Sequence, residues 1–118
     1  MSKTIKGDRL FGESIVLINW DGRVDLLPPM IAYPDGFLGA YDWGNQSTGA
    51  LQLAYSIMRY FLSRERADAI YGAYLEEVIA TLKFDHWEIS EEDIKIWINR
   101  QMQQRLALSY FQIRAIGS

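Results

Sequence analysis

The chain has 118 residues, which suits one domain with a single hydrophobic core. Apolar residues make up 49% and aromatic residues 14% of the sequence, and this composition excludes an intrinsically disordered chain. The absence of cysteine excludes a disulfide scaffold and a thiolate metal site, and it fits a cytoplasmic protein. We expect no membrane association, because the most apolar segment, residues 50–62, is too short to cross a bilayer.

The net charge of −3 conceals an uneven distribution. Residues 1–93 contain eight basic and 15 acidic residues, whereas residues 94–118 contain no acidic residue and four basic ones, Lys95, Arg100, Arg105 and Arg114. Basic residues toward the end of a helix complement its dipole, and this is the explanation we prefer. The alternative is a basic face for a nucleic-acid partner, although four charges make a small electrostatic footprint.

A β-hairpin is predicted near the N-terminus. Residues 14–20 are rich in β-branched and apolar side chains, Asp21-Gly22 is a typical type I′ turn, and residues 23–27 alternate polar with apolar side chains. Pro28 and Pro29 end the second strand because proline has no N–H to donate. Residues 4–10 are a candidate third strand. In the connection over residues 28–46, we expect the aromatic residues, among them Tyr33 and Phe37, to pack on the core.

The most distinctive segment is a polar, glycine-rich turn that leads directly into an apolar helix predicted over residues 48–62. Ser47 or Thr48 is expected to cap this helix. The turn also offers a second interpretation, because the free N–H groups of a helix N-terminus can hold a phosphate or carboxylate. The candidate ligand-binding residues are Tyr41, Trp43, Gly44, Ser47, Thr48 and Gly49. We favour the capping role, since Ala50 and Leu51 replace the Lys and Ser or Thr of a phosphate loop.

Two further helices are predicted. The second follows the link over residues 63–65 and keeps its apolar periodicity to Leu82, and the third begins at Ser90 and continues to about residue 115. We expect one α+β domain over residues 1–98 and a helical extension over residues 99–118. This extension outreaches a compact domain, so a second subunit is expected to cover its apolar side. The candidate oligomer contacts are Met102, Leu106, Tyr110 and Ile113.

Catalytic and metal-binding motifs are incomplete. His86 is the only histidine, and the spacing around Ser47 does not match the nucleophile turn of a serine hydrolase. Asp85, His86 and Glu88 contain the ligand types of a metal site, but one histidine is little for zinc. Residues 85–90 are therefore interpreted as a solvated loop with Trp87 and Ile89 facing inward. We expect neither enzymatic activity nor a cofactor or metal.

The order of these motifs resembles an uncharacterised family of small domains from bacteria, archaea and their viruses. The likeness spans residues 5 to about 98 and is carried by Lys6-Gly7-Asp8-Arg9, the hairpin, Tyr41-Asp42-Trp43-Gly44, Thr48-Gly49, Gln52-Leu53-Ala54, Trp87, Ile94 and Trp97. This resemblance implies a shared fold and no established activity. The fold expected is α+β, with a two- or three-stranded antiparallel sheet packed on three helices, the last one long.

Three functional hypotheses follow. The first is a non-enzymatic binding protein, such as a phage or mobile-element inhibitor that binds a host defence protein; small size, an acidic body, the incomplete catalytic motifs and the viral members of the resembled family favour it. The second is a sponge that holds a phosphorylated nucleotide at the start of the 48–62 helix, with Trp43 or Tyr41 stacked on the base. The third is a DNA-associated regulatory protein that uses the basic residues of the last helix.

Overall fold

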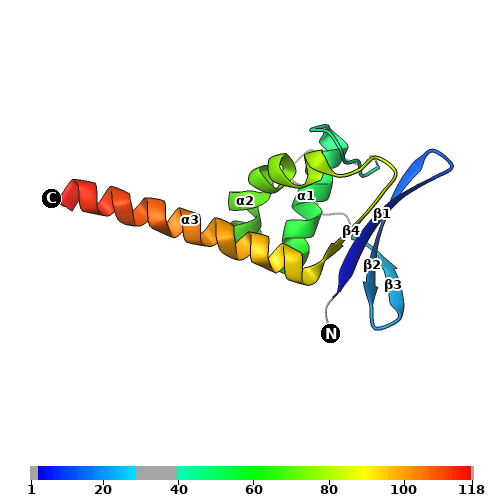
Figure 1. Cartoon of the computed structure of the whole chain (residues 1–118), viewed down its shortest axis with the longest axis horizontal. Coiled ribbons are helices and arrows are strands. Elements are labelled where there is room, and N and C mark those ends of the chain that lie inside the picture. The colour runs from blue at the N-terminus through cyan, green and yellow to red at the C-terminus, as the bar shows by residue number, and fades with distance from the viewer. Residues whose placement is uncertain (1–2, 29–39, 118) are drawn as a thin grey trace.

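The computed structural model describes residues 3–28 and 40–117, with side chains described as far as Leu106. Four strands and three α-helices form the domain, joined by one short 3₁₀ turn (Figure 1). In chain order the elements are β1 (Thr4–Leu10), β2 (Glu13–Trp20), β3 (Arg23–Leu26), α1 (Thr48–Phe61), α2 (Arg64–Glu77), η1 (Ile79–Thr81), β4 (His86–Ser90) and α3 (Glu91–Gly117). The α+β class expected from the sequence is confirmed.

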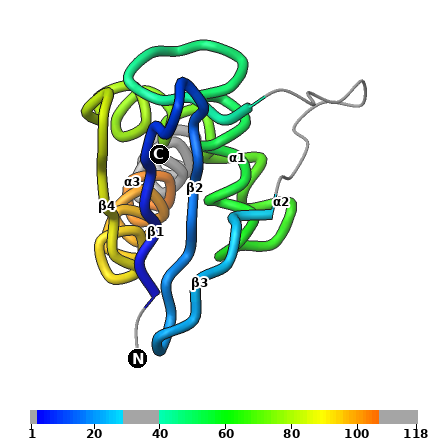
Figure 2. Tube along the Cα trace, turned by 90° about the vertical axis from the view of Figure 1, so that its right-hand side faces the viewer, coloured from blue at the N-terminus to red at the C-terminus, as the bar shows by residue number. Residues whose placement is uncertain are grey.

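The four strands form one antiparallel sheet in the order β3-β2-β1-β4. Figure 2 shows the sheet in front, with the helices packed behind it on one face. Alternate side chains along each strand point to that face, and the buried ones are Ile5, Val16, Ile18, Trp87 and Ile89. The sheet therefore supplies one wall of the core and leaves its other face open.

Two tight turns connect the first three strands. Asp21 and Gly22 both have positive φ, 49° and 78°, as a type I′ turn requires, so the predicted hairpin is confirmed. The β1–β2 turn repeats this backbone with Phe11 at φ 52° and Gly12 at φ 80°. The candidate strand over residues 4–10 is likewise confirmed.

The fourth strand corrects the sequence interpretation, which placed residues 85–90 in a solvated loop. β4 pairs with β1 through its whole length, so that Trp87 lies opposite Gly7 and Ile89 opposite Ile5. The inward direction of Trp87 and Ile89 was expected correctly, because alternation is the pattern of a strand. The partner strand lies about 80 residues earlier, and local sequence carries no signal of such a pairing.

Helix α1 is the centre of the fold. Its N-cap is Ser47, whose hydroxyl accepts a hydrogen bond from the Ala50 N–H, and nine of its 14 residues are buried. In Figure 1 the helix lies between the sheet and α2. A helix that is apolar around most of its circumference must be covered on most sides, and this is the position that the sequence predicted.

Helix α2 is shorter than expected. It ends at Glu77 instead of Leu82, and the chain continues through the 3₁₀ turn η1. Val78, Ile79 and Thr81 are β-branched residues with low helix propensity. The 3₁₀ turn also contacts the segment before α1, because the Ile79 carbonyl accepts a hydrogen bond from the Gly44 N–H at 2.9 Å. Because Ile79 is buried, the apolar periodicity continues past Glu77, and the sequence therefore predicts a longer helix than the structure has.

Helix α3 starts as the sequence predicted. The Ser90 hydroxyl accepts from the Asp93 N–H at 3.1 Å, and three acidic residues occupy the first turn. A hydrogen bond from the Glu91 N–H to the Lys3 carbonyl ties this start to β1. The helix has 27 residues, about 40 Å at 1.5 Å per residue, and its C-terminal half projects beyond the body (Figure 1). The predicted side-chain contacts of Tyr110 and Ile113 lie outside the described side chains, as Tyr33 and Phe37 lie outside the described residues.

Gly7 of β1 and Trp87 of β4 are in close contact on the core side of the sheet. A Cβ atom at Gly7 would lie 2.2 Å from the Trp87 indole, far inside van der Waals contact. The indole therefore occupies the space over the glycine of the neighbouring strand, and no larger residue fits there without moving it.

We predict that Gly7→Ala destabilises the protein by about 1–3 kcal/mol, because the added methyl group displaces Trp87 from the core. Gly72→Ala is the matched control, since a Cβ at this helical glycine meets nothing within 4 Å. The control should stabilise by about 0.5–1 kcal/mol through helix propensity. Urea unfolding of both variants measures the two shifts, and a Gly7→Ala protein as stable as wild type would refute the close packing.

Candidate functional site

The corner between the sheet and α1 is built around Trp43. Its side chain is fully buried, and the indole N–H donates to the Phe84 carbonyl at 2.9 Å. The ring packs edge-to-face against Trp87, with centroids 5.4 Å apart and an interplanar angle of 83°. Trp43 is thus a core residue with a satisfied polar group, and no face of it is free to stack on a base in this conformation.

Arg9 of β1 closes the corner from outside. Its guanidinium lies 4.4 Å from the centroid of Trp43 and 4.0 Å from that of Phe84. The same group donates to the Phe84 carbonyl at 2.8 Å and forms an ion pair with Asp42 at 2.7 Å. A guanidinium held by two rings, a carbonyl and a carboxylate has little freedom, so the corner is rigid.

The Asp42 carboxylate is the common hydrogen-bond acceptor of the turn. One carboxylate oxygen accepts from Arg9 and from the Trp43 N–H, and the other accepts from the Asn45 amide at 3.0 Å and the Ser47 hydroxyl at 3.3 Å. Burial alone would raise the pKa of Asp42, but these hydrogen bonds and the Arg9 charge outweigh burial and lower the pKa from 3.8 to about 2. The carboxylate is therefore ionised throughout the ordinary pH range.

The predicted ligand residues lie around this carboxylate. Gly49 is buried so closely against residues 40–42 that a Cβ would lie 2.7 Å from the Ala40 carbonyl oxygen. Gly44 has a φ of 76°, and Ser47 is the cap. Tyr41 is half-buried, and the Thr48 side chain is exposed. The protein thus places its own anion, Asp42, beside the N-terminus of α1, which favours the structural interpretation of the turn.

The outer face of the sheet carries a row of charges across β1 and β4. His86 Nδ1 lies 2.7 Å from the Asp8 carboxylate, and Lys6 lies 3.0 Å from Glu88. Asp85, His86 and Glu88 were the candidate metal ligands. Across the described residues, no group of three such side chains is arranged to hold a metal ion.

The basic residues of the predicted face have different neighbours. Lys95 pairs with Glu91 at 2.6 Å, Arg100 lies beside Trp97, and Arg105 donates to the Ala69 carbonyl of α2. The side chain of Arg114 lies outside those that the structure describes. Where the structure shows these cations, they serve separate parts of α3 and do not form a stripe.

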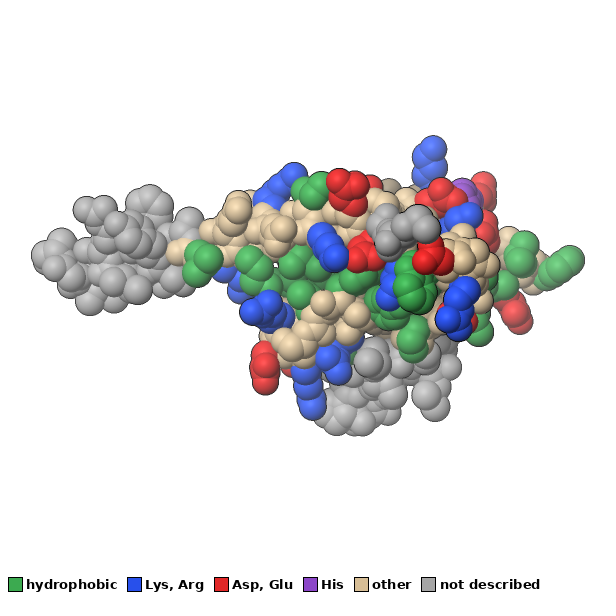
Figure 3. All heavy atoms as spheres, turned by 90° about the horizontal axis from the view of Figure 1, so that it is seen from below, with side chains coloured by type: hydrophobic (Ala, Val, Ile, Leu, Met, Phe, Trp, Pro, Cys, Tyr) green, Lys and Arg blue, Asp and Glu red, His purple; other side chains and the backbone are tan. Residues whose placement is uncertain are grey.

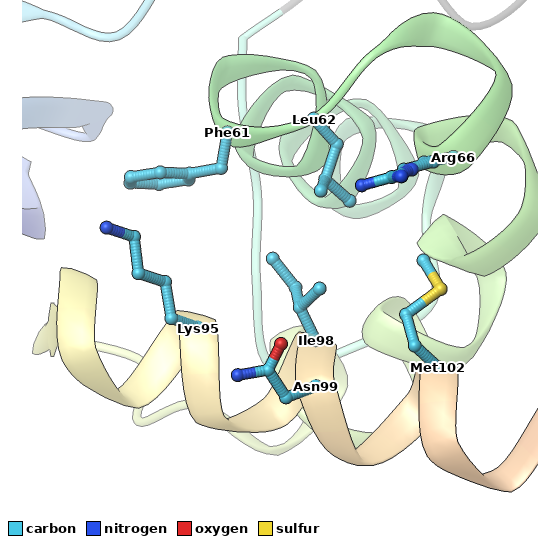
Figure 4. Close-up of a pocket in the computed structure, with 7 residues that line it drawn as sticks. All are labelled: Phe61, Leu62, Arg66, Lys95, Ile98, Asn99 and Met102. Atoms are coloured by element: carbon cyan, nitrogen blue, oxygen red, sulfur yellow. The ribbon is translucent and has the colours of Figure 1, made fainter.

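A groove brings Lys95 and Met102 together with residues that the sequence analysis did not single out (Figure 4). It lies between the α1–α2 junction and α3 and has a volume of about 280 Å³. Its lining residues are Phe61, Leu62, Arg66, Lys95, Ile98, Asn99 and Met102. In the close-up the apolar side chains approach each other from both walls, with the two cations at the sides.

Arg66 is the unusual residue of this groove. It occupies the first turn of α2, where the positive helix dipole disfavours a cation, and it shares this turn with Arg64 and the acidic Glu65. Within the described residues its guanidinium has no hydrogen-bond or ion-pair partner, although its backbone N–H is capped by Ser63. Two arginines in a helix's first turn are the sequence signal that could have identified this site.

We predict that Asp42→Asn flattens the loss of stability in acid. Because the pKa of Asp42 is lower in the folded protein than its ordinary 3.8, its contribution is complete above about pH 4 and disappears as pH falls through about 2. Denaturant unfolding at a series of pH values measures this window. Glu76→Gln, an exposed carboxylate of α2, is the control and should keep the wild-type profile. An unchanged acid profile in Asp42→Asn would contradict the role of the ion pair.

No helix among the described residues is both long and apolar enough to cross a bilayer.

Comparison with known proteins identifies the family of this chain. A search of curated proteins and a search of solved structures found no match to the chain. A family model for a family of unknown function, DUF6166, matches residues 5–100, which include the sheet, the corner and the groove except for Met102. The chain therefore belongs to the DUF6166 family, for which no activity is established.

Proposed function

We propose that this protein is a non-enzymatic binding protein that captures an acidic, amphipathic segment of a protein partner in the groove between the α1–α2 junction and α3. The observation that carries the proposal is Arg66, a cation without a partner among the described residues, held beside an apolar floor. A carboxylate of the partner would pair with Arg66 and also lie at the positive N-terminus of α2.

The lining of the groove suits a peptide anchor. Leu62, Ile98 and Met102 offer apolar surface from two different elements, which is how a groove receives the apolar face of a helix. Its volume of about 280 Å³ lies just below the roughly 300–1,000 Å³ of small-molecule sites. A few apolar side chains of a longer ligand would fill it better than an enclosed small molecule.

Charge limits which part of a second copy could occupy the groove. Residues 94–118 contain four basic residues and no acidic one, so this part of a neighbouring α3 would bring like charge to Arg66 and Lys95, whereas the first turn of α3 carries Glu91, Glu92 and Asp93. Of the candidate oligomer contacts, Leu106 is 70% exposed outside the groove, whereas Met102 lines the groove, so the two proposed uses of α3 overlap at Met102.

Inhibition of a host defence system by a phage or mobile element is the biological role we propose for such capture. It requires only a protein-binding surface, and the groove offers one. The nucleotide-sponge and DNA-binding hypotheses stay predictions from the sequence. The burial of Trp43 and the separate positions of Lys95, Arg100 and Arg105 give them no added support.

We predict that a fluorescein-labelled amphipathic peptide of Leu and Glu binds the wild-type protein, and that Arg66→Glu weakens this binding by about tenfold or more. The reason is the loss of one charge pair and the gain of a repulsive one. Fluorescence anisotropy measures both affinities. An analogous peptide of Leu and Lys should bind the Arg66→Glu protein better than the wild type.

Arg23→Glu is the matched control, because it makes the same charge change at an exposed residue of β3, outside the groove. It should leave both affinities within about twofold of wild type. Equal weakening by Arg23→Glu would show that net charge alone governs binding. Failure of the Leu–Glu peptide to bind at all would refute the groove as a site for acidic segments.

A further inference from the structure

The β1–β2 turn presents an unusual residue at its tip. Phe11 is fully exposed, with a relative accessibility of 105%, and Leu10 beside it is 52% exposed. Phe84, in the segment before β4, is 67% exposed, and its ring lies against Arg9, the residue that precedes Leu10 in β1. We name Leu10, Phe11 and Phe84 the hydrophobic tip. Figure 3 shows hydrophobic side chains projecting at the end of the molecule opposite α3.

Phe11 is unfavourable for the isolated fold in two ways. Its φ of 52° lies in the left-handed region, which Asn, Asp and Gly tolerate and a bulky aromatic residue does not. Its ring gains nothing from burial. The equivalent position of the β2–β3 turn holds Asp21, an ordinary choice for this turn. The same backbone therefore has a well-suited residue in one hairpin and an ill-suited one in the other.

The tip is supported by the rigid corner. The Phe84 carbonyl accepts hydrogen bonds from both the Trp43 indole and Arg9, so the backbone under the Phe84 ring is fixed. Arg9 directly precedes Leu10 and is held by Asp42. An aromatic side chain on a rigid support loses little entropy when it binds, which is the property of an interface anchor.

We infer that the hydrophobic tip is a second docking point, and that Phe11 inserts into an apolar pocket of a protein partner. The exposed charged residues next to the tip in sequence are Glu13, Asp85 and Lys83, and Arg9 is neutralised by Asp42, so this flank is acidic by one charge. The pocket that fits it has a basic rim. An anionic membrane surface, the other receiver of an exposed aromatic residue, is disfavoured by this acidic flank. The tip and the groove lie toward opposite ends of β1, so this site is distinct from the proposed groove.

The test uses the full chain with a photo-crosslinking phenylalanine analogue at position 11, in cells that contain the natural partner. The expected product is a discrete protein adduct that unlabelled wild-type protein competes away. Competition by Phe11→Asn should need about 30-fold more protein, the effect of losing one anchor residue. Phe11→Tyr should compete like the wild type. The analogue at Val24, 58% exposed on β3, is the control and should not give the adduct.

Thermal unfolding shows whether Phe11→Asn competes less well because the anchor is missing or because the protein is misfolded. Phe11→Asn should unfold at or above the wild-type temperature, because asparagine suits the left-handed turn better. Asp21→Asn, the same change in the sister turn, should leave competition unaltered. Three results would overturn the inference. The first is that Phe11→Asn competes as well as the wild type, and the second is that the analogue at position 24 gives the same adduct. The third is that the wild type binds phosphatidylcholine–phosphatidylserine vesicles and Phe11→Asn does not. Arg66→Glu should leave the adduct unchanged, so the result of the crosslinking test does not depend on the groove.

Discussion

The interaction on which the rest of the structure depends is the enclosure of Trp43 by Arg9, Phe84 and Trp87. It joins three parts of the chain that are distant in sequence: β1, the turn before α1 and the segment before β4. Asp42 neutralises the cation, and the hydrogen bonds of the turn complete the cap of α1. The sheet and the central helix therefore meet at one fixed corner.

The buried residues of the corner and the open surfaces of the domain have different roles. The residues that form the distinctive local motif are occupied with each other, so they hold the domain together. The surfaces that remain open lie elsewhere, in the groove beside α3 and at the tip of the β1–β2 turn. Both have features that lower the stability of the isolated chain, a cation at the start of α2 and an aromatic residue in a left-handed turn. Such features persist most readily where binding uses them.

Local physics accounts for what the sequence predicted correctly. The Asp21-Gly22 turn, the N-cap of α1 and the Ser90 cap are each determined by a few neighbouring residues. The turn and the Ser90 cap lie where the sequence predicts them, and Ser47 is one of the two cap candidates for α1. The inward positions of Trp87 and Ile89 followed from alternation.

The errors and omissions have a common cause, which is distance along the chain. β4 forms because β1 lies beside it, and Arg9 reaches partners 33 and 75 residues away, at Asp42 and Phe84. The 3₁₀ turn after α2 also contacts a distant part of the chain, because the Ile79 carbonyl accepts a hydrogen bond from the Gly44 N–H. The groove likewise forms only when α3 folds back against the α1–α2 junction. No pattern within one segment encodes these contacts.

Hydrogen exchange of the Trp43 indole N–H, followed by NMR, tests the central claim most directly. The account predicts protection close to that of the most stable backbone amides, because exposure of this group requires the whole corner to open. It also predicts that added nucleotides leave the indole resonance unchanged. Rapid exchange, or a resonance that moves on addition of a nucleotide, would show that Trp43 is an accessible ligand contact and would contradict the account.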